Sequence, residues 1–127
     1  HLCQLLEVGW EKEKRVILMS GKIPIGKTLS LLPHCDVVVG PETGVLNAAS
    51  MLPNHKCVFL SHSSNENLTK HWKNTTAFEP EDCHCFPCHK LHFGFSTCNR
   101  DEKSGGALCA ANIKPDRVVT DIMRNLK

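Results

Sequence analysis

Short apolar runs alternate with helix-like segments over the first part of the chain. The runs predict strands at residues 15–21, at residues 36–40 and from Lys56, and the β-branched residues of the second run predict burial on both faces. Helices are expected before, between and after these strands, at residues 2–8, 26–35, 43–52 and 65–72. Because strands alternate with helices, we expect an α/β fold with a parallel sheet and right-handed crossovers.

The pattern becomes irregular after Pro80. Residues 80–112 hold five of the eight cysteines, namely Cys83, Cys85, Cys88, Cys98 and Cys109. An amphipathic helix is expected at the C-terminus, with Pro115 in its first turn. Its predicted buried stripe consists of Val118, Val119, Ile122, Met123 and Leu126. We therefore interpret residues 1–127 as a single, partial domain with a cysteine-rich irregular segment at residues 80–112.

Composition narrows the class of protein. Of 127 residues, 41% are hydrophobic and 22% charged, as in ordinary globular chains. The net charge of +2 does not predict nucleic-acid binding. No apolar run approaches the roughly 20 residues that span a bilayer, and no signal segment is expected. The chain begins at His1 and its first dozen residues resemble the tail of a helix, so we expect a longer protein.

The main candidate site is the stretch DVVVGPETGVLNAAS, residues 36–50. Ligands of open parallel sheets bind at the carboxyl ends of the strands, where this turn is predicted. Gly40 and Gly44 allow close backbone approach, Thr43 can cap the next helix, and the helix start offers free N–H groups to a phosphate. Glu42 would repel a phosphate, and it fits better as an acceptor for sugar hydroxyls or as the partner of a cation. Strand, turn and capped helix also occur in α/β proteins without such a site.

Two stretches carry a resemblance to a known family. A Gly-Lys segment, a helix, a strand, the turn PETGVLNAA, another strand and the loop SHSS follow in this order, and CFPCHKLHFGFSTC later precedes IKPDRVVTDI. Both are similar to the heptosyltransferase-like glycosyltransferases, family nine, with their Asp-Thr-Gly-x-x-His-x-Ala turn and their Cys-x-x-Cys…Cys region before an Ile-x-Pro-x-x-Val helix. The resemblance covers nearly the whole chain, from about Val16. It implies a Rossmann-like domain, the C-terminal half of a two-domain GT-B architecture.

The resemblance also implies a donor site for a nucleotide-diphosphate sugar. The contacts carried over from the family's turn are Glu42, Thr43, Gly44 and Asn47. Glu42 replaces the usual Asp, and Asn47 replaces the usual His, so Asn47 can donate a hydrogen bond but cannot carry charge. Lys22 matches the Gly-Lys segment and would bring positive charge to the diphosphate, although a solvated lysine is at least as good an interpretation. The loop SHSS carries hydroxyl groups that would hydrogen-bond to the ligand or cap the helix near Asn65. They belong to Ser61, Ser63 and Ser64.

The function implied is donor binding in an inverting glycosyltransferase that acts on lipopolysaccharide or a related glycan. The catalytic base and the binding site for the glycan or lipid-linked acceptor would lie in an N-terminal domain, so this chain alone should bind the donor without turnover. No cofactor is required for such chemistry. The α/β pattern, the lack of an expected signal segment and the cysteines placed on strands favour a reducing cytoplasm, with a peripheral place at the inner face of a bacterial membrane. Two alternatives stay open: a non-catalytic nucleotide-sugar-binding module and a zinc-stabilised protein-interaction domain.

The cysteines allow a structural zinc site. Its predicted ligands are Cys85, Cys88, Cys98 and Cys109, and a histidine could replace one of them, from among His84, His89 and His92. Free or redox-active thiols remain an alternative. Cys35 and Cys57 are expected to be small core residues. Sequons at Asn67 and Asn74 would suit a secreted, disulfide-bonded protein, but the α/β pattern favours reduced cysteines.

Overall fold

A computed structural model describes residues 8–90, 96 and 98–127 of the chain. Its sheet has the order β1-β2-β3 and is parallel throughout, which confirms the expected α/β class. The strands are β1 (Val37–Pro41), β2 (His55–Phe59) and β3 (Thr75–Phe78). The helices are α2 (Ile25–Leu31), α3 (Gly44–Ala49), α4 (Leu108–Ala111) and α5 (Pro115–Asn125), with the short turns η1 (Leu32–His34) and η2 (Asn65–Thr69). Nearly all of the helix predicted at residues 2–8 lies outside the described residues.

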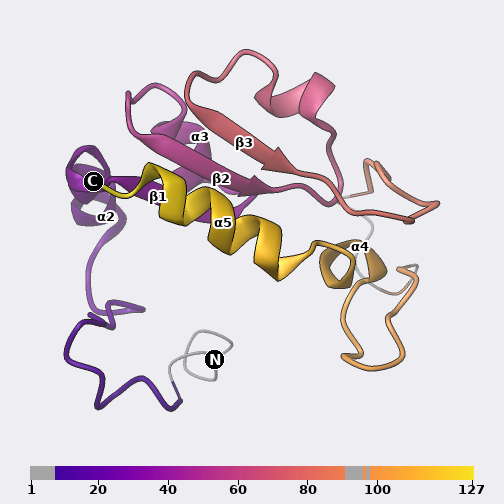
Figure 1. The fold of residues 1–127 in the computed structure, drawn as a ribbon, viewed down its shortest axis with the longest axis horizontal. Coiled ribbons are helices and arrows are strands. Elements are labelled where there is room, and N and C mark those ends of the chain that lie inside the picture. The colour runs from indigo at the N-terminus through magenta and orange to yellow at the C-terminus, as the bar shows by residue number, and fades with distance from the viewer. Residues whose placement is uncertain (1–7, 91–95, 97) are drawn as a thin grey trace.

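Helices cover both faces of the sheet (Figure 1). Alternate residues of β2 point to opposite faces. Val58 belongs to the core shared with α3, where Leu46 and Ala49 are buried, whereas Cys57 belongs to the core beneath α5, with Val118 and Phe78. The helices on each face of the sheet therefore pack on a separate small apolar core.

The carboxyl ends of the strands lie at one edge of the sheet. Pro41 of β1 is in register with Phe59 of β2, which is in register with Phe78 of β3. In Figure 1 the arrowheads of β2 and β3 point toward the side on which α4 lies. The turn after β1 and the loop after β2 therefore start from neighbouring points, as the sequence predicts for a ligand-binding edge.

The predicted strand at residues 15–21 is wrong. These residues form no strand, and Ile17 is 78% exposed. A strand needs a hydrogen-bonded neighbour, and β1 is the edge of the sheet in the described part of the chain. The prediction that this second run is buried on both faces is also wrong, since Val39 of β1 is exposed. Gly21, predicted to end the strand at residues 15–21, has a φ of 68° in a turn instead.

The C-terminal helix forms with Pro115 at its start, as predicted, but its buried stripe differs. Val118 is buried and Ile122 packs beneath the helix, whereas Val119, Met123 and Leu126 are exposed. The face turned to the sheet continues through Asp121, which hydrogen-bonds to residues of β2 and β3. A polar residue thus occupies a core-facing position that the apolar pattern assigned to solvent.

The remaining differences concern short elements. The helix expected at residues 43–52 ends at Ala49, and the one at residues 65–72 is only the turn η2. Strand β3 was not predicted, although Thr75, Thr76 and Phe78 are of types that favour strands; it pairs with β2 in parallel register along its whole length. No helix in the described parts of the chain is long and apolar enough to span a bilayer.

Candidate functional site

Glu42 joins the turn after β1 to the loop after β2. Its Oε2 accepts hydrogen bonds from the backbone N–H groups of Ser61 and His62, both at 3.1 Å, and from the Ser61 hydroxyl at 2.8 Å. Its Oε1 accepts from the N–H group of Ser63 at 2.8 Å, and His62 Nδ1 lies 2.7 Å from Oε2. The Glu42 side chain is only 4% exposed. Its carboxylate is therefore a buried brace between the two loops that were predicted to meet a ligand.

Three of the predicted donor contacts lie on the surface beside this brace. Thr43, Gly44 and Asn47 are exposed, and no atom would lie within 4 Å of a Cβ added at Gly44. Gly40 instead meets the protein itself, because a Cβ there would lie 2.9 Å from Cδ2 of Leu46. Glycine at position 40 therefore serves the packing of α3, while the turn that follows is open to solvent.

Helix capping at this edge differs between the two loops. Thr43 occupies the position before α3 but makes no side-chain capping bond, so the predicted capping by its hydroxyl is wrong. Ser64 occupies the same position before η2, and its Oγ accepts a hydrogen bond from Asn67 N at 3.4 Å. The interpretation of the serine loop as a helix cap is therefore confirmed for Ser64, while the hydroxyl of Ser61 is bonded to Glu42.

An apolar pocket of about 440 Å³ opens at the same edge, between the strand ends and the segment from α4 to α5. It is lined by Pro41, Phe59, Leu60, Ser61, Ala110, Ile113, Pro115, Val118 and Val119. Such a lining suits the apolar face of a small ligand, with the polar loops at its rim. Lys22 takes no part in this pocket; its ammonium donates to the carbonyl oxygen of Leu18 at 2.8 Å.

Two contacts join the beginning of the cysteine-rich segment to its end. The Asn99 side chain lies 2.8 Å from Nε2 of His84, and the Asn112 side chain donates to the carbonyl oxygen of Glu81 at 2.9 Å. These contacts bring residues 81–88 toward residues 98–112. None of the seven described cysteines forms a disulfide, and His92 lies outside the described residues.

The thiols of this segment influence one another. Cys83 Sγ and Cys85 Sγ are 3.6 Å apart. Burial raises the pKa of Cys109, a backbone hydrogen bond at Ala110 opposes this, and the nearby thiols of Cys85, Cys88 and Cys98 raise it further. The four predicted zinc ligands are therefore close enough to influence one another electrostatically. They do not form a compact ligand set; in the described part of the chain, the compact set of metal-ligating side chains lies at other residues.

That compact set consists of His55, Cys57 and Asp121, hereafter the His-Cys-Asp centre, whose ligand atoms all lie within 4.8 Å of one another. His55 Nε2 lies 2.7 Å from Oδ2 of Asp121, and the Cys57 thiol donates to the same oxygen at 3.1 Å. The Thr76 hydroxyl donates to Oδ1 at 3.0 Å. These contacts attach α5 to both β2 and β3.

The pKa values at the His-Cys-Asp centre follow from burial and from these contacts. Burial opposes ionisation of Asp121, but hydrogen bonds from His55, Cys57 and Thr76 outweigh it and hold the pKa of the carboxyl below its ordinary value. Burial, together with the hydrogen bond and charge of Asp121, raises the pKa of Cys57 to about 12. The Cys57 side chain is therefore a neutral thiol in the metal-free protein.

Sequence reasoning missed the His-Cys-Asp centre. Its only local signal is that residues 55 and 57 alternate along a strand and so share a face. Cys57 is buried as predicted, whereas Cys35 is exposed and that prediction is wrong.

In comparisons with known proteins, no family model, curated protein or solved structure matches this chain. Fold and site thus define a parallel α/β protein with a braced pair of loops at the carboxyl edge of its sheet.

Proposed function

We propose that the chain is the donor-binding part of an inverting glycosyltransferase of the heptosyltransferase-like kind. The observation that carries the proposal is the Glu42 brace, which unites the turn after β1 and the serine loop after β2 at the carboxyl edge of parallel strands. Nucleotides bind at this edge in open α/β sheets. The sequence resemblance supplies the reaction class, with the family's cytoplasmic setting and its lipopolysaccharide-type acceptor.

In this proposal the exposed residues Thr43, Gly44 and Asn47 contact the diphosphate and sugar, while Ser63 and Ser64 line the opposite loop. Glu42 acts as a positioning residue, because both of its oxygens are taken by the loop. The apolar pocket beside the strand ends suits the less polar part of the donor. Lys22 would have to leave Leu18 to reach the diphosphate, so it ranks last among the proposed contacts.

In this proposal the donor-binding chain contributes to the reaction through electrostatic stabilisation. Hydrogen-bond donors aimed at the leaving diphosphate stabilise the charge that grows on it as the sugar is transferred. The acceptor hydroxyl needs a base that the proposal places in an N-terminal domain. We therefore expect the chain alone to bind nucleotide diphosphates and to transfer no sugar.

Titration with ADP, UDP and GDP, followed by amide NMR shifts, tests this proposal. We expect one of the three to shift the amides of Thr43 and Gly44. Asn47→Ala should weaken binding about fivefold, because one hydrogen bond of about 1 kcal/mol is lost. Asn125→Ala, at the opposite edge of the sheet, is the matched control and should bind as the unmodified chain does. If none of the three nucleotides at millimolar concentration moves the amides around Thr43, the donor site is refuted.

The cysteine-rich segment supports a second candidate role, a zinc-stabilised interaction domain. The mutual influence of the thiols and the contacts that gather residues 81–88 and 98–112 favour it. We expect one equivalent of zinc on this segment, held by Cys85, Cys88, Cys98 and Cys109. Elemental analysis should show that Cys88→Ser loses this equivalent, while Cys35→Ser, at an exposed cysteine, keeps it. Equal zinc contents in these two variants would contradict the site.

A further inference from the structure

The His-Cys-Asp centre has the chemistry of a metal site. It offers one imidazole, one thiol and one carboxylate, a set suited to borderline ions such as Zn²⁺ and Co²⁺ and unsuited to Mg²⁺ or Ca²⁺, which prefer oxygen ligands. Zinc bonds to these atoms measure about 2.0–2.3 Å. The separations of 2.7 and 3.1 Å from Asp121 Oδ2 to the other two ligand atoms need to widen by less than about 1 Å on a tetrahedral ion, and the ligand atoms of His55 and Cys57 lie within 4.8 Å of each other.

The charges and outer contacts of the centre also fit a divalent cation. A Cys57 thiolate and the Asp121 carboxylate would carry two negative charges side by side, which a divalent ion neutralises and which repel each other without one. The Thr76 hydroxyl already holds Oδ1 of Asp121, so that Oδ2 faces His55 and Cys57. Carboxylate ligands of metals are oriented by outer hydrogen bonds of this kind.

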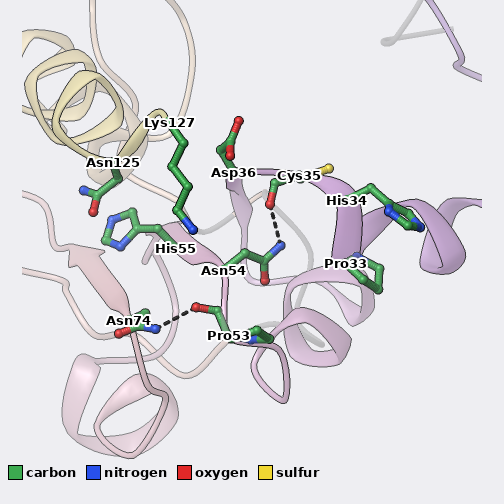
Figure 2. Close-up of a pocket in the computed structure, with 10 residues that line it drawn as sticks. All are labelled: Pro33, His34, Cys35, Asp36, Pro53, Asn54, His55, Asn74, Asn125 and Lys127. Carbon is green, nitrogen blue, oxygen red and sulfur yellow. Dashed lines mark hydrogen bonds between the residues drawn. The ribbon is translucent and has the colours of Figure 1, made fainter.

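Solvent reaches the centre from two sides. His55 lines a pocket of about 390 Å³ at the amino edge of the sheet, and Figure 2 shows it among the other lining residues, which include Asn125. Asp121 and Thr76 line a separate pocket of about 330 Å³ beside α5. The side chains of His55 and Asp121 keep 14% and 19% exposure, whereas Cys57 is fully buried, so an ion would enter past the imidazole and the carboxylate.

We propose that His55 Nε2, Cys57 Sγ and Asp121 Oδ2 bind one divalent transition-metal ion of the zinc type, leaving a fourth coordination position free. Binding releases the Cys57 thiol proton to solvent and requires the His55 proton to reside on Nδ1. Because the ligands come from β2 and α5, the ion fixes the C-terminal helix to the sheet. This site is independent of the donor-binding function proposed above.

Cobalt titration of the reduced, metal-free chain tests the proposal, since thiolate-bound tetrahedral Co²⁺ has charge-transfer and visible absorption bands. The cysteine-rich segment is silenced by replacing Cys85, Cys88, Cys98 and Cys109 with serine. In this background we expect one equivalent of Co²⁺ to bind and to produce a thiolate-to-cobalt charge-transfer band. Cys57→Ser should abolish the band, Asp121→Asn should weaken binding at least about tenfold, and Cys35→Ser should change neither.

A second measurement covers the case in which the four-serine background does not fold. Zinc added to the unmodified chain should shift the ring nitrogen resonances of His55 and leave those of the exposed His34 unchanged. The proposal is overturned if a folded four-serine variant takes up no Co²⁺, if Cys57→Ser retains the band, or if saturating zinc leaves the His55 resonances in place. These outcomes are read without nucleotide, so they stand apart from the fate of the donor site.

Discussion

Replacing Glu42 with alanine is expected to lower the free energy of unfolding by about 3 kcal/mol, measured by urea denaturation. The carboxylate is 4% exposed and accepts hydrogen bonds from three successive backbone N–H groups, those of Ser61, His62 and Ser63. Without it, these donors lose their buried acceptor, and the loop has to open to water to satisfy them. Amide hydrogen exchange at the three residues should become faster in the same variant.

Two further variants test the length of the Glu42 side chain and supply a control for the loss of a carboxylate. Glu42→Asp keeps the charge but is one methylene shorter, so it should reach only part of the loop and lose about half as much stability. Glu66→Ala removes an exposed carboxylate paired with Lys70 and should cost less than about 1 kcal/mol. A Glu42→Ala protein that is as stable as Glu66→Ala would show that the brace contributes nothing to the fold.

Replacing Asp121 with alanine in the metal-free chain is expected to cost a similar amount, about 3 kcal/mol. The carboxylate accepts from the Cys57 thiol and the Thr76 hydroxyl and contacts the His55 ring, so its loss leaves polar groups of two strands without a partner beneath α5. Urea denaturation followed by circular dichroism measures the loss. Hydrogen exchange along α5 should rise selectively, because this residue attaches the helix to the sheet.

Asp116→Ala is the matched control, since it removes an exposed carboxylate from the first turn of the same helix. Its cost should stay below about 1 kcal/mol, the usual contribution of such a charge to the helix dipole. Asp121→Asn should fall between the two, because its amide oxygen can still accept from Thr76. If Asp121→Ala and Asp116→Ala are equally stable, the carboxylate does not anchor the helix.

Patterns with a local cause predicted their elements well. The β-branched run that became β1 and the proline-started helix α5 depend on neighbours within a few residues, so the sequence reveals them directly. The strand predicted at residues 15–21 failed because an apolar run becomes a strand only beside a partner. Strand β3 was missed because its four residues are too short a run to show a period, although they pair with β2 along their whole length.

At the candidate site, too, the sequence predicted the local features and missed the contacts between distant residues. The sequence located the turn at Glu42 and the serine loop, because both follow strands of a parallel sheet. It did not show that the Glu42 side chain turns inward, since its hydrogen-bond partners lie 19 to 21 residues further along the chain. Whether the turn contacts a nucleotide sugar stays a prediction, supported by the family's motif and by the position of the turn.

By itself, the sequence determined the parallel α/β class and the positions of β1, α3, β2 and α5, because these depend on periodicity and on glycine and proline over short distances. The inward carboxylate of Glu42 and the His-Cys-Asp centre arose only on folding. Asp121 lies 64 residues from Cys57 along the chain, and the packing of α5 on β2 alone brings the two within 3.1 Å. Contacts of that separation leave no periodic trace, because they are set by how whole elements pack.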